Sequence, residues 1–234
     1  MSPPARKPRA KQAKVSPTKT IESVQRPNVE HMWLKTRGRL DRIDKHSKQH
    51  TVVEDIGQKK AILRELGLRN YATLHTHIIN PEMNLDRNLS VRAMGFKNMD
   101  RTFTPNLPSS SDFRDLLQNF GERTSIIAQT HPETGEAAGF YFLRKTKKSP
   151  RIPIMSRGSK SSMIRSIGYE THPQVRKVTS ATQEYNNRLE RYWEMGDAER
   201  FKVFGDTLDS LKLQFKAKPR KGYKHVPGLG FVKK

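Results

Sequence analysis

The sequence contains no cysteine among its 234 residues. Without thiols the chain forms no disulfide, thiolate zinc site or iron–sulfur centre, and it has no cysteine nucleophile. Hydrophobic residues make up only 33% of the chain, and no run of them approaches the length of a membrane span or of a secretory signal core. We therefore expect a protein that is neither secreted nor transmembrane, located in the cytoplasm, the nucleus or a virion.

Acidic residues are scarce in three stretches of the chain, where basic residues are concentrated. Residues 1–48 hold 13 Lys and Arg against 4 Asp and Glu, residues 144–177 hold 10 against 1, and residues 212–234 hold 8 against none. The remainder is slightly acidic, although the whole chain has a formal net charge of +22. Self-repulsion opposes such clustering, and a polyanion relieves it. The pattern therefore predicts basic segments that bind nucleic acid.

The arrangement of apolar residues predicts an α+β protein that leans towards helix, with a small compact body. We expect a basic disordered arm over 1–48, an α+β body over 49–143, a basic loop over 144–177, a helical hairpin over 178–215 that packs on the body, and a basic tail over 216–234. The basic arms contain too few apolar residues to offset the entropy lost on ordering, so we expect them to be disordered until they bind.

Local patterns predict the elements of the body. Thr51-Val-Val-Glu54 has the spacing of a capping box and predicts the start of a helix. Residues 71–79 alternate as in a β-strand, and a short amphipathic helix is expected from Ser111. Residues 124–145 predict a β-hairpin whose loop is His131-Pro-Glu-Thr-Gly135.

The candidate contacts to phosphate are basic side chains of the three segments. They are Arg6, Lys7, Arg9, Lys11, Arg37, Arg39, Arg144, Lys145, Lys147, Lys148, Arg151, Arg176, Lys218, Arg220 and Lys221. Because each neutralised phosphate releases counterions, the expected affinity falls steeply with salt. Tyr223, His225 and Phe231 are candidates for stacking on unpaired bases.

Three segments resemble parts of known nucleic-acid-binding families. The proline- and lysine-rich N-terminal arm is similar to the tails of linker histones, and Arg37-Gly-Arg39 resembles the core of an AT-hook without its flanking prolines. Gly139-Phe-Tyr-Phe-Leu143 resembles the RNP1 strand of RNA-recognition motifs, in which aromatic side chains stack on bases. Several positions depart from that motif, and a hairpin strand with one aromatic face in the core explains the same pattern.

A further resemblance concerns the helical hairpin. Gln174-Val-Arg-Lys-Val178 and the two helices after it resemble a ribbon-helix-helix module over 174–213. In that family the strand places side chains in the major groove, and by position these are Gln174, Arg176 and Val178 here. An ordinary helical hairpin that closes the core is the alternative.

His75-Thr-His77 places two imidazoles on one face of a strand. The pair resembles the metal-binding histidines of HUH-type nucleases, which also need a third ligand and a nucleophilic tyrosine, for which Tyr185 and Tyr192 are candidates. Histidine pairs on a strand are more often solvated or hydrogen-bonded. The sequence has no phosphate-binding loop, dinucleotide fingerprint or hydrolase elbow. We therefore expect no catalytic residue, metal or cofactor.

These observations together predict a non-catalytic nucleic-acid-binding protein. RNA is favoured over DNA, and the protein is expected to be a component of a ribonucleoprotein, viral or packaging particle, with other proteins of the particle as possible partners. One alternative is a DNA-binding regulator or accessory protein of a mobile element that uses residues 174–213. A second alternative is a metal-dependent nuclease or relaxase that uses His75 and His77.

Overall fold

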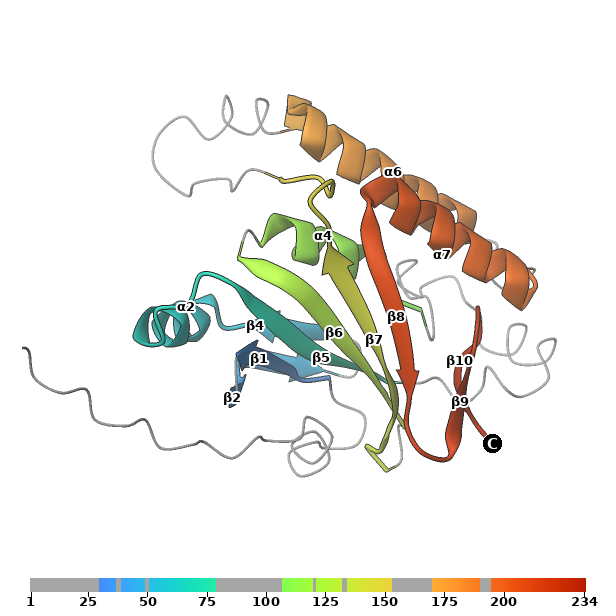
Figure 1. Ribbon diagram of the computed structural model, residues 1–234, viewed down its shortest axis with the longest axis horizontal. Coiled ribbons are helices and arrows are strands. Elements are labelled where there is room, and N and C mark those ends of the chain that lie inside the picture. Colours follow the sequence, from blue (N-terminus) through green and yellow to red (C-terminus); the bar gives the residue numbers. More distant parts are fainter. Residues whose placement is uncertain are drawn as a thin grey trace, which may run out of the picture.

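The computed structural model describes residues 30–36, 39–48, 51–78, 107–119, 121–131, 134–152, 170–189 and 195–234. Its main element is a mixed sheet of six strands in the order β2-β1-β5-β6-β7-β8 (Figure 1). The strands are β1 (Met32–Thr36), β2 (Arg39–Arg42), β5 (Tyr71–Ile78), β6 (Glu122–Thr130), β7 (Ala137–Lys145) and β8 (Leu213–Pro219). Only β5 and β6 pair in parallel, and the other neighbours in this sheet are antiparallel.

Two small hairpins complete the β-structure of the described residues. One consists of β3 (Asp44–Lys48) and β4 (Thr51–Glu54), and the other of β9 (Tyr223–Val226) and β10 (Gly230–Lys233). The second hairpin packs on β7 through Gly139, where an added Cβ atom would lie 2.5 Å from the ring of Phe231. Glycine is therefore needed at this position for the hairpin to approach the sheet.

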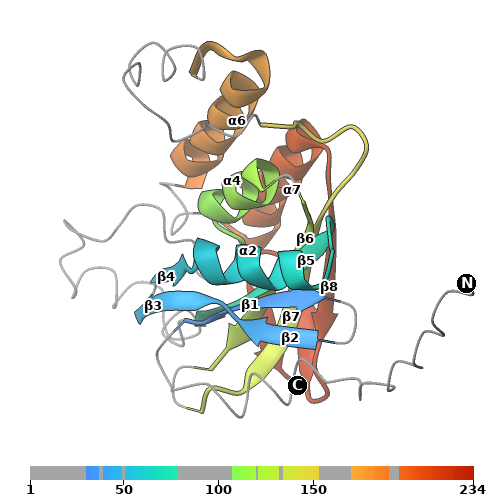
Figure 2. The same cartoon turned by 90° about the vertical axis from the view of Figure 1, so that its left-hand side faces the viewer.

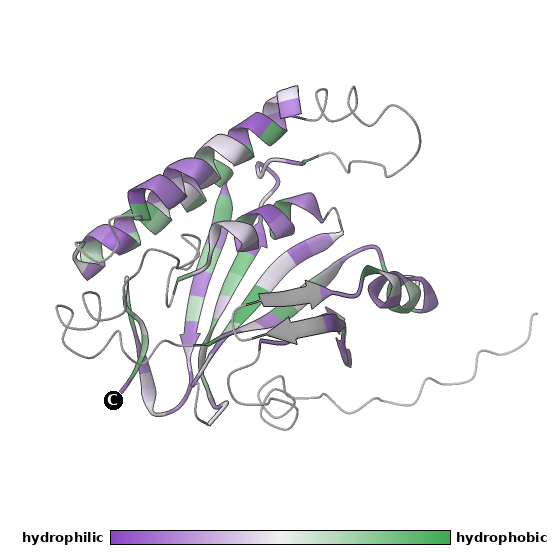
Figure 3. Cartoon of the chain, turned by 180° about the vertical axis from the view of Figure 1, so that it is seen from behind, coloured by the Kyte–Doolittle hydropathy of each residue, from purple (hydrophilic) through white to green (hydrophobic). Residues whose placement is uncertain are grey.

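The four described helices cover one face of the sheet (Figure 2). They are α2 (Ile56–Glu65), α4 (Ser110–Gln118), α6 (Pro173–Leu189) and α7 (Asp197–Leu211). Leu34 of β1 packs with Ile62 of α2, whereas Ile127 of β6 and Tyr141 of β7 lie in one large core cluster with residues of α4, α6 and α7. Figure 3 shows the mixture of hydrophilic and hydrophobic residues on α6 and α7 that such a surface position requires.

The other face of the sheet carries no described helix. Its centre is a smaller cluster of Trp33, Leu74, Ile126 and Ala128, against which Phe140 and several other partly buried side chains pack. Strand pairing links these positions, because Trp33 lies opposite Leu74 and Leu74 lies beside Ile126. The two faces of the same strands therefore have different surroundings.

The structure confirms the α+β class, the β-hairpin and the C-terminal helical pair. The strand expected at 71–79 is β5, the expected hairpin is β6 and β7, and α6 and α7 form the pair. Of the disordered arm expected over 1–48, residues 1–29 lie outside the described residues, but strands β1, β2 and β3 lie within 32–48, so the expectation is wrong there. Half of the basic loop expected over 144–177, residues 153–169, lies outside the described residues, and α6 already begins at Pro173. No helix in the described part of the chain is long and apolar enough to cross a membrane.

Two of the expected elements are wrong. Thr51–Glu54 forms strand β4, and the helix begins afterwards, with the Asp55 side chain accepting a hydrogen bond from the backbone N–H of Gln58. The consecutive β-branched residues of this segment favour a strand over the capping box. Gln174–Val178 is part of helix α6, where Val175 and Val178 are buried at helical spacing. The strand of the ribbon-helix-helix module is therefore absent from that segment.

The expected basic tail over 216–234 is also wrong, because these residues belong to β8, β9 and β10. Along β8 buried Leu213 and partly buried Phe215 alternate with exposed Gln214, Lys216 and Lys218. This period-two pattern is that of a strand with one face in the core. The lysines on the exposed face give this segment the composition of a basic tail, although its apolar residues alternate as in a strand.

Candidate metal centre

His75 and His77 lie two residues apart on β5, so both imidazoles point to the helix-covered face of the sheet. Strand β5 is internal to the sheet, between β1 and β6. His75 is buried and the side chain of His77 is only 20% exposed. The sequence alone places the two rings on one face, and their burial comes from the packing of α4 above them.

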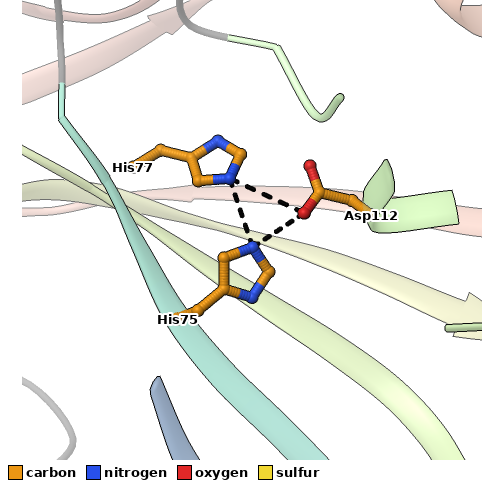
Figure 4. Close-up of side chains that lie close together, drawn as sticks. All are labelled: His75, His77 and Asp112. Carbon is orange, nitrogen blue, oxygen red and sulfur yellow. Dashed lines mark hydrogen bonds and ion pairs between the residues drawn. The ribbon is translucent and has the colours of Figure 1, made fainter. Parts of the chain in front are cut away.

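Asp112 of α4 is the third member of the cluster (Figure 4). It is the third residue after the N-cap Ser109, and the two form a capping box. The backbone N–H and the hydroxyl of Ser109 both donate to Asp112 Oδ2, at 2.6 and 2.8 Å. The helix cap thus holds one carboxylate oxygen, and the other oxygen, Oδ1, faces the histidines.

The three facing atoms surround a common point. His75 Nε2 lies 2.8 Å from Asp112 Oδ1 and 3.2 Å from His77 Nε2, and His77 Nε2 lies 3.6 Å from Asp112 Oδ1. Figure 4 shows both rings turning the same nitrogen towards the carboxylate. It is the one cluster of this kind found in the described residues.

These distances fit a tetrahedral metal ion. Zinc binds histidine nitrogen and carboxylate oxygen at about 2.0–2.2 Å, which separates neighbouring ligands by roughly 3.3–3.5 Å in a tetrahedron. The separations of 3.2 and 3.6 Å lie close to that value, whereas His75 Nε2 and Asp112 Oδ1, at 2.8 Å, are at hydrogen-bond distance. Two imidazoles and one carboxylate are also the donors of catalytic zinc sites, in which the fourth position holds water. His75, His77 and Asp112 therefore fit a divalent ion such as zinc.

Glu30 adds a fourth ionisable group at the same place. Met32 of β1 lies opposite His75, and Thr76 N–H donates to the carbonyl of His31, so the pairing continues towards Glu30 and His77. Glu30 is two residues before Met32, which places it on the same face as the histidines. It is buried, with 6% of its surface exposed.

The electrostatics of the cluster favour a positive charge between its members. Burial raises the pKa of Glu30 to about 6, although the two histidines and the backbone N–H of Ile78 oppose this shift. Burial alone would lower the pKa of His77, but the charge of Asp112 and its hydrogen bond raise it to about 9. Burial would likewise raise the pKa of Asp112, but His77 and His75 lower it well below its ordinary value.

The tyrosines proposed as nucleophiles do not complete this site. The hydroxyl of Tyr185 donates to the carbonyl of Pro108 at 2.8 Å, and its buried ring packs edge-on against Phe113. Tyr185 is thus part of the core. Tyr192 lies outside the described residues.

The basic side chains predicted to bind phosphate are dispersed over the chain. Arg6, Lys7, Arg9, Lys11 and Arg37 lie outside the described residues. Arg144, Lys147, Lys148, Arg151, Arg176, Lys218 and Lys221 are exposed.

The other three predicted contacts have partners within the protein. Arg39 pairs with Asp41 and Glu65. Lys145 donates to the carbonyl of Asn119, and burial lowers its pKa to about 8. Arg220 pairs with Glu136.

Two features of the C-terminal half concern predicted nucleic-acid contacts. Arg176 and Arg114 line a groove of about 580 Å³ between α6 and α4. Tyr223 and Phe231 are buried, and Phe231 packs on the ring of Tyr141. Neither ring is available to stack on bases as the sequence predicted, because the β9–β10 hairpin turns both into the core.

The two histidines were predicted from the sequence, whereas Asp112 and Glu30 were not. Ser109-Ser-Ser-Asp112 before an apolar helical stripe has a capping spacing that points to Asp112. No local signal marks Glu30, because only the pairing of β1 with β5 brings it to the site.

Comparison of the chain with protein-family models, with curated proteins and with solved structures finds no match.

Proposed function

We propose that this protein is a hydrolase that uses one divalent metal ion, most simply zinc. The observation that carries the proposal is the convergence of His75 Nε2, His77 Nε2 and Asp112 Oδ1 on one point. The buried Glu30 beside them supports a catalytic rather than a purely structural metal site. A structural zinc site has four protein ligands, whereas a catalytic one has three and a water.

The proposed reaction is attack of water on a carbonyl carbon. A bound ion would lower the pKa of a water molecule and polarise the carbonyl of the substrate. Glu30 accepts the proton of the attacking water and returns it to the leaving group, which balances the hydrolysis. Glu30 is buried on the same face as the three ligands, so its carboxylate is placed for both steps.

The class of bond that fits best is an amide, as in a peptide. Two histidines, one carboxylate ligand and a separate glutamate base are typical of zinc peptidases. The nuclease alternative of the sequence analysis needs a nucleophilic tyrosine, and Tyr185 is held in the core by its hydrogen bond to Pro108. Water activated by Glu30 needs no such residue.

Metal content and peptide hydrolysis by the purified full-length chain test the proposal. We expect one zinc per chain by elemental analysis and cleavage of a fluorogenic peptide library. His75→Ala removes both properties. Glu30→Gln retains the metal but lowers kcat about 10²–10⁴-fold, the range of general acid–base catalysis.

Glu65→Gln is the matched control, because the Glu65 side chain is 64% exposed. It should leave metal content and rate unchanged. A chain that binds no zinc at micromolar concentrations, or a Glu30→Gln variant with full activity, contradicts the proposal. Cleavage of single-stranded DNA with a covalent tyrosine adduct would instead support the relaxase alternative.

We also propose that the chain binds nucleic acid through its basic segments. The segregation of charge supports this second function, as do the exposed Arg144, Lys147, Lys148 and Arg151 at the end of β7 and after it. A particle component that binds RNA remains the favoured form of this proposal. Its test is binding to RNA and DNA across a salt series, where affinity should fall steeply as salt rises.

A further inference from the structure

The sheet face without described helices presents aromatic and basic side chains where β7 and β8 pair. Phe140 lies opposite Lys218, and Phe142 lies opposite Lys216. Arg144 follows on β7 with the same orientation, because side chains alternate along a strand. We call Phe140, Phe142, Arg144, Lys216 and Lys218 the aromatic–basic strip. It lies on the face opposite to the metal centre.

The charges of the strip are available to a ligand. Arg144, Lys216 and Lys218 are exposed, and among the described residues none of the three forms an ion pair, in contrast to Arg220 at the end of β8. The neighbours of the strip on β6 include Thr124 and Ile126, which carry no charge. The local potential is therefore positive.

The aromatic rings of the strip are partly exposed. Phe140 and Phe142 pack at the margin of the cluster that contains Ile126 and Ala128, and each keeps part of its surface open to solvent. Lysine on an edge strand such as β8 is a common protection against unwanted strand pairing. Protection of the edge explains Lys216 and Lys218, but it does not explain the aromatic rings of Phe140 and Phe142 opposite them.

We infer that the aromatic–basic strip binds single-stranded nucleic acid. Two bases stack on Phe140 and Phe142, and the lysines and Arg144 contact the phosphates between and beside them. Stacking on a flat ring combined with phosphate contacts is the general mode of single-strand binding. This inference rests on the proposal that the chain binds nucleic acid, and it is independent of the proposed hydrolase.

The charge complementarity selects this occupant over an acidic protein. Each of the two cross-strand pairs sets one ring on β7 beside one lysine on β8, and a single strand likewise carries one base and one phosphate per nucleotide. Lys216 and Lys218 are two residues apart on β8, so they are about 7 Å apart along the strand. Both cations are therefore within reach of consecutive phosphates.

Fluorescence anisotropy with labelled single-stranded oligonucleotides tests the inference on the full-length chain. Lys216→Glu combined with Lys218→Glu should weaken binding of oligo-dT and oligo-rU at least about tenfold at moderate salt. The matched control is Lys60→Glu with Lys202→Glu, which changes the net charge equally on helices α2 and α7, outside the three basic segments. This control should weaken binding much less.

A second variant tests the stacking separately from the charge. Phe142→Leu keeps apolar bulk against Ile126 but removes the flat ring. It should weaken binding about fivefold or more for an oligonucleotide with bases, and leave binding of an abasic oligomer of equal length unchanged. Thermal unfolding of each variant shows whether the fold is retained.

Each other result overturns the inference. Equal losses in the two double-lysine variants would show that affinity follows net charge and not the strip. Full affinity after Lys216→Glu and Lys218→Glu would place any nucleic-acid site elsewhere and leave the broader proposal standing. If the unchanged chain binds no oligonucleotide, both the inference about the strip and the broader proposal of nucleic-acid binding are wrong. Selective binding of an acidic peptide by the strip instead of an oligonucleotide would also overturn the inference.

Discussion

The two faces of the six-stranded sheet differ in chemistry, although the same strands contribute to both. On the helix-covered face, β5 contributes His75 and His77 to a buried cluster of ionisable groups. On the other face, the same strand contributes Leu74 to an apolar cluster bordered by Phe140 and Phe142. Neighbouring residues of a strand point to opposite faces. Leu74 therefore joins the apolar cluster, while His75 and His77 join the ionisable cluster on the other side of the sheet. The face covered by helices is where desolvation perturbs ionisation most.

The largest predicted effect is a loss of function on the helix-covered face that leaves the function of the other face unchanged. His77→Ala should abolish metal binding and lower hydrolysis at least about a thousandfold, because the ion loses one of three ligands. The same variant should bind single-stranded oligonucleotides as the unchanged chain does. Elemental analysis, peptide cleavage and anisotropy measured on one preparation check the prediction. A parallel loss of oligonucleotide binding would show that the two faces are coupled.

A smaller effect is expected for the residue that orients the carboxylate ligand. Ser109→Ala removes the hydroxyl that donates to Asp112 Oδ2 and should weaken zinc affinity about 10–100-fold, as loss of an outer hydrogen bond to a metal ligand commonly does. Competition with a chelator measures this affinity. Ser109→Thr, which keeps the hydroxyl, should restore most of it. If both variants bind zinc equally well, the cap does not position Asp112.

Two glycine substitutions are expected to change stability in opposite directions. Gly139→Ala puts a Cβ atom 2.5 Å from the buried ring of Phe231 and should lower the free energy of unfolding by about 1–3 kcal/mol. Gly205→Ala lies within α7 with nothing near its added Cβ atom and should raise it by up to about 1 kcal/mol. Chemical denaturation measures both. Equal effects would contradict the packing of β10 on β7.

The last prediction concerns the pH dependence of stability caused by a buried carboxyl group on the helix-covered face. Burial raises the pKa of Glu122 to about 8 from its ordinary value of 4.5, although the hydroxyl of Thr73 donates to it. The folded chain therefore binds this proton more tightly than the unfolded chain, so the group makes stability fall as pH rises from about 4.5 to about 8. Glu122→Gln should flatten this dependence, by on the order of 1 kcal/mol per pH unit at most.

Denaturant unfolding at pH 5 and above pH 8 measures the contribution of Glu122. The matched control is Glu184→Gln on α6, whose side chain is 70% exposed. The control should retain the slope of the unchanged chain. An unchanged slope in Glu122→Gln would mean that this carboxyl group does not bind an extra proton in the folded protein.

Part of the fold was predictable because its signals are local. The hairpin of β6 and β7 was expected from two alternating runs joined by a short loop with glycine, and the helical pair from apolar stripes separated by Gly196. Residues 216–234 were misassigned because net charge outweighed the alternation of Leu213 and Phe215 with the lysines of β8. Composition is thus a poor guide where a strand has one polar face.

The amino-acid sequence by itself determined the class of fold, the segregation of charge and the placement of His75 and His77 on one side of a strand. Each of these follows from residues close together in the chain. Only the tertiary structure decided that Asp112 and Glu30 join the histidines, because helix packing and the antiparallel pairing of β1 with β5 connect residues far apart in the sequence. Burial then raises the pKa of Glu30, whereas His77 and His75 lower the pKa of Asp112. Both shifts depend on what surrounds a group in the fold and not on its neighbours in the chain.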